Sequence, residues 1–303
     1  MFTVEAAQFW QWRSRAIEAA IALCIDVAEL DWLLLELTDL DRLTLRFGDT
    51  SNRVSIALNI SFADLEALWE QRLNDRIPVQ YLVGHSHWRQ FTFQVSPAVL
   101  IPRPETELII DLVQAAVAEN PGLAEGIWLD LGTGSGAIAI GLADALPNAS
   151  IHAVDLSHDA LAIAQANAHK YGFDPRIQFH QGSWTEPIQH LTGRIAGLIS
   201  NPPYIPSPIV TTLEPEVQNH EPHLALDGGD DGLDAIRHLV LAGQQLLQPQ
   251  GFWLVEMMAG QGEAVQRLLQ QSSYERIRIE YDLAGHDRFC SAYKFCSAYK
   301  VSV

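Results

Sequence analysis

Apolar side chains recur at helical spacing through the first 78 residues of the chain. Residues 6–23 carry them every three or four positions, as one face of an amphipathic helix does, and residues 32–37 form a second such stretch. A third predicted helix begins at Ser61, whose hydroxyl can cap its first turn, and runs to about residue 73. We therefore predict a small helical N-terminal domain over residues 1–78, with its apolar faces packed inward and a surface compatible with docking a partner.

The pattern changes in residues 79–103, where bulky and polar side chains alternate. This alternation, clearest at residues 87–95, is the period-two signature of a strand or hairpin, and we interpret it as a β-hairpin connector between two domains. A helix is predicted next, over residues 105–117, with Pro104 suited to its first turn. Residues 120–122, Asn-Pro-Gly, are expected to end it.

From residue 127 onward, apolar runs alternate with helical stretches. The predicted strands are 127–131, 150–154, 177–180, 196–200 and 252–257, and the predicted helices include 156–171, 231–247 and 261–271. This alternation predicts an α/β domain over residues 104–303, built on a mostly parallel, doubly wound sheet with both faces covered. Ligands of such sheets bind beyond the carboxyl ends of the strands, where the strand order reverses.

A short duplication stands near the C-terminus. Residues Phe289–Lys294 are followed at once by the same six residues, Phe295–Lys300. One copy would complete a final strand, and we expect the second to extend from the sheet edge without a function of its own.

The charge balance narrows the class of partner. There are 37 Asp and Glu residues against 19 Lys and Arg residues, which gives a formal net charge of -18. Proteins that bind a phosphate backbone usually present a basic face. Nucleic acid is therefore an unfavoured substrate, and a protein or small-molecule partner is favoured.

Targeting and redox features are sparse. No apolar run approaches the ~18 residues of a membrane-spanning helix, and the N-terminus lacks a basic segment followed by an apolar one. Cys24, Cys290 and Cys296 form no C-x-x-C pair, and the 11 histidines show no metal-binding spacing. We predict a soluble cytoplasmic protein without a metal site, and nothing in the sequence demands more than a monomer.

The first chemical motif is a glycine-rich turn between a predicted strand and a predicted helix. The predicted cofactor-binding residues here are Asp130, Gly132, Thr133, Gly134, Ser135 and Gly136. The spacing also fits a dinucleotide fingerprint, in which the helix N-terminus holds a pyrophosphate. A carboxylate at Asp130 would repel a pyrophosphate but suits the cationic amino-acid end of S-adenosyl-L-methionine, so the turn favours that cofactor without excluding NAD.

The second motif is Asp155, at the end of the next predicted strand. A carboxylate at this place can accept hydrogen bonds from both ribose hydroxyls of either cofactor. The alternative is that Asp155 merely caps the helix that follows.

The third motif, Asn201-Pro202-Pro203-Tyr204, follows another predicted strand and indicates the class of reaction. The Asn201 side-chain oxygen and the Pro202 carbonyl can accept both N–H bonds of a planar NH₂ group, and the two prolines keep the loop stiff. Tyr204 can stack on the planar group and exclude water. We predict Asn201, Pro202 and Tyr204 as catalytic residues, with Pro203 as a further substrate-binding residue and Asn201 also near the cofactor. Alignment carries such a step, so no catalytic base is expected.

Together these motifs resemble the protein glutamine-N5 methyltransferases, and within them the branch that modifies peptide-chain release factors. The resemblance covers most of the chain and rests on the helical N-terminal domain and on residues 76–84, 99–107, 132–136, 155, 201–204, 221–222 and 231–233. It implies a class I methyltransferase fold with a seven-stranded sheet. It also implies S-adenosyl-L-methionine as donor and the glutamine of a Gly-Gly-Gln loop as acceptor. Trp184 matches the family residue beside the adenine, whereas Ser183 stands where the family often has Asp.

Four other interpretations stay open at this stage. A sister enzyme that methylates a ribosomal protein shares the Asn-Pro-Pro-Tyr motif, although the Arg-Pro-Glu-Thr pattern at residues 103–106 favours the release-factor branch. A nucleic-acid adenine or guanine methyltransferase would use the same motif but would want a basic groove. An NAD-dependent dehydrogenase would leave residues 201–204 without a role, and a non-catalytic module would not need them.

Overall fold

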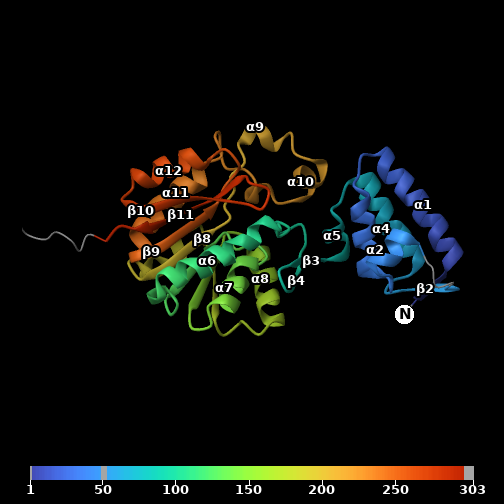
Figure 1. Ribbon diagram of the computed structural model, residues 1–303, viewed down its shortest axis with the longest axis horizontal. Helices are drawn as coiled ribbons and strands as arrows, with labels where there is room; N and C mark the ends of the chain where they lie inside the picture. The colour runs from blue at the N-terminus through green and yellow to red at the C-terminus, as the bar shows by residue number, and fades with distance from the viewer. Residues whose placement is uncertain (1, 49–52, 297–303) are drawn as a thin grey trace, which may run out of the picture. The chain divides into compact units, whose positions relative to one another are not determined.

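The computed structural model describes residues 2–48 and 53–296. The chain divides into two compact units, one formed by Met1–Gly84 with Pro215–His220 and the other by His85–Glu214 with Glu221–Val303 (Figure 1). The predicted domain boundaries were residues 78 and 103, whereas the chain passes from the first unit to the second at Gly84. The predicted connector is therefore divided, and its hairpin belongs to the second unit.

The first unit is mainly helical, as predicted. Its helices are α1 (Ala6–Ala22), α2 (Val27–Leu37), α3 (Arg42–Phe47), α4 (Phe62–Asp75) and α5 (Val79–Val83). The Ser61 hydroxyl accepts the backbone N–H of Asp64 at 3.1 Å, which confirms the predicted cap of α4. Two short strands, β1 (Phe2–Glu5) and β2 (Ser55–Leu58), pair antiparallel beside the helices and were not predicted.

The first unit also contains a helix from the second half of the sequence, α10 (Pro215–His220). The guanidinium of Arg72, only 1% exposed, pairs with Glu29 at 2.6 Å and with Glu216 of α10 at 2.5 Å. Arg76 reaches the same Glu216 carboxylate at 2.8 Å. These ion pairs hold α10 to α2 and α4.

The second unit is built on a seven-stranded sheet. Its strand order is β10 (Tyr274–Tyr281), β11 (Asp287–Lys294), β9 (Leu247–Glu256), β8 (Ile195–Ser200), β5 (Ile127–Leu131), β6 (Ser150–Asp155) and β7 (Ile177–Gln181). β5 to β9 run parallel to one another, and β11 is antiparallel to both β9 and β10. The predicted doubly wound, mostly parallel sheet is confirmed, with β10 as the strand that was missed.

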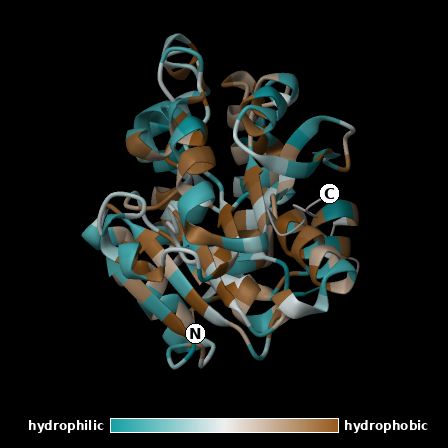
Figure 2. Cartoon of the chain, turned by 90° about the vertical axis from the view of Figure 1, so that its left-hand side faces the viewer, coloured by the Kyte–Doolittle hydropathy of each residue, from teal (hydrophilic) through white to brown (hydrophobic). Residues whose placement is uncertain are grey.

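Helices cover both faces of this sheet (Figure 1). α6 (Leu108–Glu119), α7 (Ala137–Ala145) and α8 (His158–Lys170) lie on one face, and α11 (Asp234–Leu246) and α12 (Gly262–Gln270) lie on the other. Successive residues of β5 enter different cores, with Trp128 on the α6 side and Leu129 on the α11 side. Because both faces are buried, the central strands are almost wholly apolar (Figure 2).

Shorter elements complete the second unit. The hairpin β3 (His85–Trp88) and β4 (Phe91–Gln94) packs its aromatic side chains into the core on the α6 side. Short helical turns are η1 (Glu105–Glu107), η2 (Pro121–Leu123), η3 (Glu186–Leu191), α9 (Ser207–Val210) and η4 (His223–Ala225). The helix predicted from residue 105 begins as η1 and becomes α-helical at Leu108.

The duplicated hexapeptide is partly described. Its first copy, Phe289–Lys294, forms most of β11, as predicted for a final strand. Phe295 and Cys296 follow that strand, and residues 297–300 of the second copy lie outside the described residues. Within the described ranges, none of the helices combines the length and the apolar character needed to cross a membrane.

Candidate active site

The candidate site lies where the strand order of the sheet reverses. β5 has β6 on one side and β8 on the other, so the loops that follow β5 and β8 leave the sheet from adjacent positions. The Ser200 hydroxyl at the end of β8 donates to the Leu131 carbonyl at the end of β5, at 2.6 Å. This arrangement brings the glycine-rich turn and the Asn201–Tyr204 loop together, at the place where such sheets bind ligands.

The glycine-rich turn after β5 requires glycine at particular positions. Gly132 has φ +78° and Gly136 has φ +83°, a left-handed conformation that side chains disfavour. A Cβ atom at Gly136 would also lie 3.1 Å from the Cβ of Ala164 in α8. Gly132 shapes the turn, and Gly136 permits close approach of α8 to the start of α7.

Asp130 is fully buried beneath this turn. Its Oδ2 accepts from the Thr133 hydroxyl at 2.6 Å and from the Ala139 backbone N–H at 3.0 Å. Burial raises the pKa of Asp130 to about 7, although these two hydrogen bonds act in the opposite direction. Among the described residues, Oδ1 of Asp130 has no partner. An acceptor oxygen without a partner, buried beside a binding loop, fits a cationic group.

Asp155 ties the turn to the end of β6. Its carboxylate accepts from the backbone N–H of Gly134 at 2.8 Å and from that of Ser157 at 2.9 Å. The cap of α8 is supplied by Ser157, whose hydroxyl accepts from the Ala160 N–H. Capping α8 therefore does not require Asp155. Burial raises the pKa of Asp155, opposed by the backbone hydrogen bonds that the carboxylate accepts.

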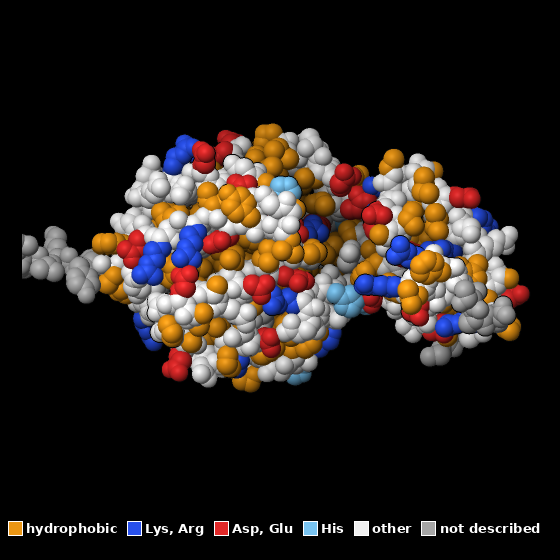
Figure 3. Space-filling view, viewed as in Figure 1, with side chains coloured by type: hydrophobic (Ala, Val, Ile, Leu, Met, Phe, Trp, Pro, Cys, Tyr) orange, Lys and Arg blue, Asp and Glu red, His pale blue; other side chains and the backbone are white. Residues whose placement is uncertain are grey.

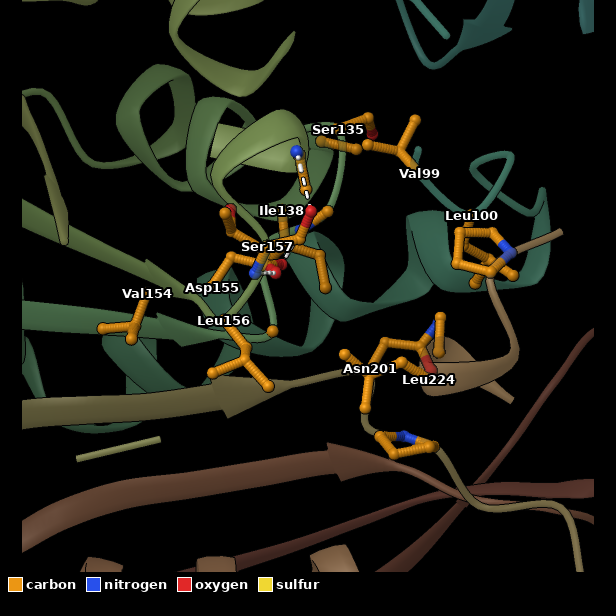
Figure 4. A pocket seen from close by; sticks show the side chains of 18 of the residues that line it. Val99, Leu100, Ser135, Ile138, Val154, Asp155, Leu156, Ser157, Asn201 and Leu224 are labelled. Atoms are coloured by element: carbon orange, nitrogen blue, oxygen red, sulfur yellow. Dashed lines mark hydrogen bonds between the residues drawn. The ribbon is translucent and has the colours of Figure 1, made fainter. Parts of the chain in front are cut away.

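One cavity collects most of the predicted cofactor residues. It is lined by Gly132, Thr133, Gly134, Ser135, Asp155, Trp184, Asn201 and Pro203 from the predicted set. Figure 4 shows Asp155 and Ser157 on one side of this cavity and Asn201 on another. Asp130, Gly136, Pro202 and Tyr204 are not among its lining residues. Trp184 has φ +50°, and its ring centroid lies 5.9 Å from that of His238.

The loop after β8 is held by polar contacts beneath it. Asn201 donates through Nδ2 to the Thr106 hydroxyl oxygen at 3.2 Å, and Thr106 donates to Oε2 of Glu256 at 2.6 Å. The Tyr204 hydroxyl donates to Oε1 of the same carboxylate at 3.0 Å. The Tyr204 hydroxyl thus contacts the end of β9, and Tyr204 is not among the residues that line the cavity. The predicted stacking of its ring on the substrate would place it at the cavity wall.

Glu256 is fully buried, and its burial raises its pKa to about 7, opposed by the hydrogen bonds from Thr106 and Tyr204. Burial together with this carboxylate also raises the pKa of Tyr204, so its phenol stays protonated as a donor.

Comparison with known proteins decides the family. A methyltransferase-domain model matches residues 124–201. The release factor glutamine methyltransferase of Synechocystis sp. is 51% identical over 291 residues, covering 95% of this chain and 97% of that protein. The chain belongs to the release factor glutamine methyltransferase family. The Thermosynechococcus vestitus protein of the same name is 46% identical, over 95% of this chain and 98% of its own length.

A solved structure supports the fold. The catalytic domain of hMettl16, crystallised with the MAT2A 3′UTR hairpin 6, matches with a TM-score of 0.57 over 88% of this chain and 90% of that domain. Its sequence is only 12% identical, so the match shows a shared methyltransferase fold alone. The predicted class I methyltransferase fold and S-adenosyl-L-methionine as methyl donor are thereby confirmed.

The side chains of this methyltransferase fit that donor. The buried Oδ1 of Asp130 is an acceptor that would suit the ammonium of the amino-acid end, and the Asp155 carboxylate at the cavity wall would suit the ribose hydroxyls. Trp184 lines the cavity with an aromatic ring that would suit the adenine. Gly132 and Gly134 leave the loop backbone uncovered beside the cavity, because neither carries a Cβ atom.

Several residues around the cavity of this enzyme were not predicted. Arg103 pairs with the buried carboxylate of Glu221 at 2.5 Å, and burial raises the pKa of Glu221 while Arg103 lowers it. This pair joins two segments that also line the cavity, 98–103 and 222–225. Thr106 belongs to the pattern noted at residues 103–106 but was assigned no role in the site. Glu256 was missed, although the sequence does place this carboxylate within the otherwise apolar run 252–257.

Proposed function

We propose that this methyltransferase modifies the side-chain amide nitrogen of the glutamine in the Gly-Gly-Gln motif of peptide-chain release factors. One observation carries the assignment of the acceptor site: Asn201 lies at the wall of the same cavity as Asp155. Its Nδ2 donates to Thr106, and its Oδ1 takes no part in that contact. Among the described residues, neither Oδ1 of Asn201 nor the Pro202 carbonyl has a hydrogen-bond donor. Both therefore stay available as acceptors.

Two acceptors suit a primary amide. The NH₂ group of a glutamine side chain is planar, and its lone pair is delocalised into the carbonyl. Acceptance of both N–H bonds by Asn201 and Pro202 would orient the nitrogen and favour its pyramidalisation, which localises the lone pair. Alignment of this kind can supply ~7–11 kcal/mol of the barrier. As the N–C bond forms, the S–C bond breaks and sulfur leaves as a neutral thioether. The nitrogen becomes acidic in the same step, so it loses its extra proton to solvent without a strong base.

The donor binds on the β5–β6 side of the cavity. When bound, S-adenosyl-L-methionine supplies an electrophilic methyl group on sulfur. Asp130, Asp155 and Trp184 are proposed to hold its ammonium, ribose and adenine. Tyr204 is proposed to act in the site by fixing the loop through Glu256 rather than by presenting its ring to the amide.

The remaining proposals concern the partner. We propose that residues 1–78 dock the release factor and that the enzyme acts in the cytoplasm, where translation ends. On the face of the second unit that Figure 3 shows, Lys and Arg side chains are interspersed with Asp and Glu rather than gathered in one basic field. Together with the net charge of -18, this supports a protein substrate over nucleic acid.

Methyl transfer from labelled S-adenosyl-L-methionine to a purified release factor tests the proposal. A copy of the factor whose Gly-Gly-Gln glutamine is changed to alanine is the matched control. We expect label in the first and none in the second. Equal label in both would show another acceptor residue, and no label in either would direct the search to ribosomal protein and then to nucleic acid.

A further inference from the structure

The side-chain amide of Asn201 can face the substrate in two orientations, and only one of them suits the proposed function. With Oδ1 toward the cavity, Asn201 accepts from the NH₂ group of the substrate. With Nδ2 toward the cavity, it would present a donor to a donor. The family's binding loop alone does not choose between them, because oxygen and nitrogen of an asparagine amide have nearly the same shape.

The structure holds a chain of hydrogen bonds that makes this choice. Glu256, at the end of β9, is 0% exposed, and Thr106, in η1, is 4% exposed. Thr106 donates its hydroxyl hydrogen to Glu256 at 2.6 Å, and the Thr106 oxygen accepts Nδ2 of Asn201 at 3.2 Å. Burial raises the pKa of Glu256 to about 7, so the carboxylate is ionised above that pH. In that state it only accepts hydrogen bonds, so it takes the Thr106 hydroxyl hydrogen and leaves the Thr106 oxygen to accept from Asn201.

We infer that Thr106 and Glu256 are positioning residues that orient the Asn201 amide, so that its oxygen faces the acceptor nitrogen. The inference rests on the proposed function for its benefit to catalysis, but the orientation itself is a property of the free enzyme. Thr106 lines the cavity, but neither it nor Glu256 is among the groups proposed to contact the acceptor amide.

The second oxygen of Glu256 extends the same control to the rest of the loop. Oε1 accepts the Tyr204 hydroxyl at 3.0 Å, so one carboxylate anchors the loop on both sides of the two prolines. Because the stiff Pro202-Pro203 pair lies between these anchors, the position of the Pro202 carbonyl is tied to that of Asn201.

Thr106→Val removes the hydroxyl while keeping the side-chain volume, and Thr106→Ser restores it. We expect Thr106→Val to lower kcat about 10- to 100-fold. The KM for the release factor and the dissociation constant for S-adenosyl-L-methionine should change little. Thr106→Ser should recover most of the activity. Thr192→Val, at an exposed threonine of the same unit, is the matched control and should behave as the unaltered enzyme.

A second measurement does not depend on activity. In ¹⁵N-labelled enzyme, the side-chain NH₂ signals of Asn201 are assigned by their loss in Asn201→Ala, and their exchange with water is followed. We expect protection in the unaltered enzyme and in Thr106→Ser, and its loss in Thr106→Val. Thr106→Ala is a second hydroxyl-free variant with the same expectation, should valine disturb folding.

The two readouts separate the possible failures. Unchanged protection of the Asn201 NH₂ group in both hydroxyl-free variants would overturn the relay, whatever the activity. Lost protection with unchanged kcat would show that the orientation does not matter for the reaction, which also overturns the inference. An unaltered enzyme that fails to methylate the release factor, with protection behaving as expected, would refute the proposed function and leave the relay standing as a structural finding.

Discussion

The carboxylate of Asp155 accepts the backbone N–H of Gly134 at 2.8 Å, which joins the end of β6 to the glycine-rich turn after β5. The same carboxylate accepts the N–H of Ser157 at the start of α8. Because it also lines the cavity, Asp155 links the shape of the turn to the proposed ribose site.

Replacement of Asp155 by alanine is expected to weaken cofactor binding. The variant loses a charged acceptor for the ribose hydroxyls as well as the bond to Gly134. Hydrogen bonds to charged groups contribute ~1.5–3 kcal/mol, so affinity for S-adenosyl-L-methionine should fall about 10- to 100-fold. Titration calorimetry measures it, with Asp159→Ala, whose side chain is 84% exposed, as control. Unchanged affinity would remove Asp155 from the site.

Gly136 and Gly172 separate backbone strain from close packing. Both have positive φ, +83° and +74°, but a Cβ at Gly136 would meet Ala164 at 3.1 Å whereas one at Gly172 would meet nothing within 4 Å. We expect Gly172→Ala to lower the free energy of unfolding by ~1 kcal/mol and Gly136→Ala by roughly 2–4 kcal/mol. Urea unfolding of both variants provides the comparison. Equal losses would mean that contact with α8 does not constrain Gly136.

The buried guanidinium of Arg72 should be a principal stabilising group of the first unit. Arg72→Ala removes the shared partner of Glu29 and Glu216, which leaves Glu29 without this ion pair and Glu216 with Arg76 alone. Loss of one member of a buried ion pair lowers the free energy of unfolding by on the order of 3 kcal/mol. Arg15→Ala, at an exposed position of α1, is the control and should have little effect. Similar thermal unfolding of the two variants would contradict this role.

Asp130 should make the stability of the enzyme depend on pH. Its pKa rises from 3.8 to about 7 on folding, so the folded protein retains a proton that the unfolded chain releases. The contribution of Asp130 to the free energy of unfolding is fully present below about pH 4 and is lost as the pH rises through about 7. Asp130→Asn has no such proton. The free energy of unfolding of this variant should therefore rise relative to that of the unaltered enzyme between about pH 4 and about pH 7, and the difference should stay constant at higher pH. Parallel pH curves would refute the shift.

Much of the second unit could be predicted because its strands are buried on both faces. β5 and β8 follow continuous apolar runs, and the turn between β5 and α7 is marked by its glycines. β1 and β2 were missed because each has four residues, too few for a periodic pattern, and their pairing joins positions about fifty residues apart.

The sequence could not reveal the supports of the site. Glu256 is visible as a carboxylate closing an apolar run, but its partner Thr106 lies 150 residues away. The Arg72–Glu216 pair, which places α10 in the first unit, spans 144 residues. A short motif in a loop after a strand identifies residues that face a ligand. Contacts between segments far apart in the sequence can be found only when the three-dimensional fold is known.

Turnover by Asn201→Ala tests the proposed amide clamp most directly. Methyl transfer to a release factor and binding of S-adenosyl-L-methionine are measured on the same preparation, with Asn148→Ala, at an exposed asparagine, as control. We expect methyl transfer to be abolished in Asn201→Ala while cofactor binding stays largely intact, because the side chain acts on the acceptor amide. Near-normal turnover in this variant would contradict the clamp.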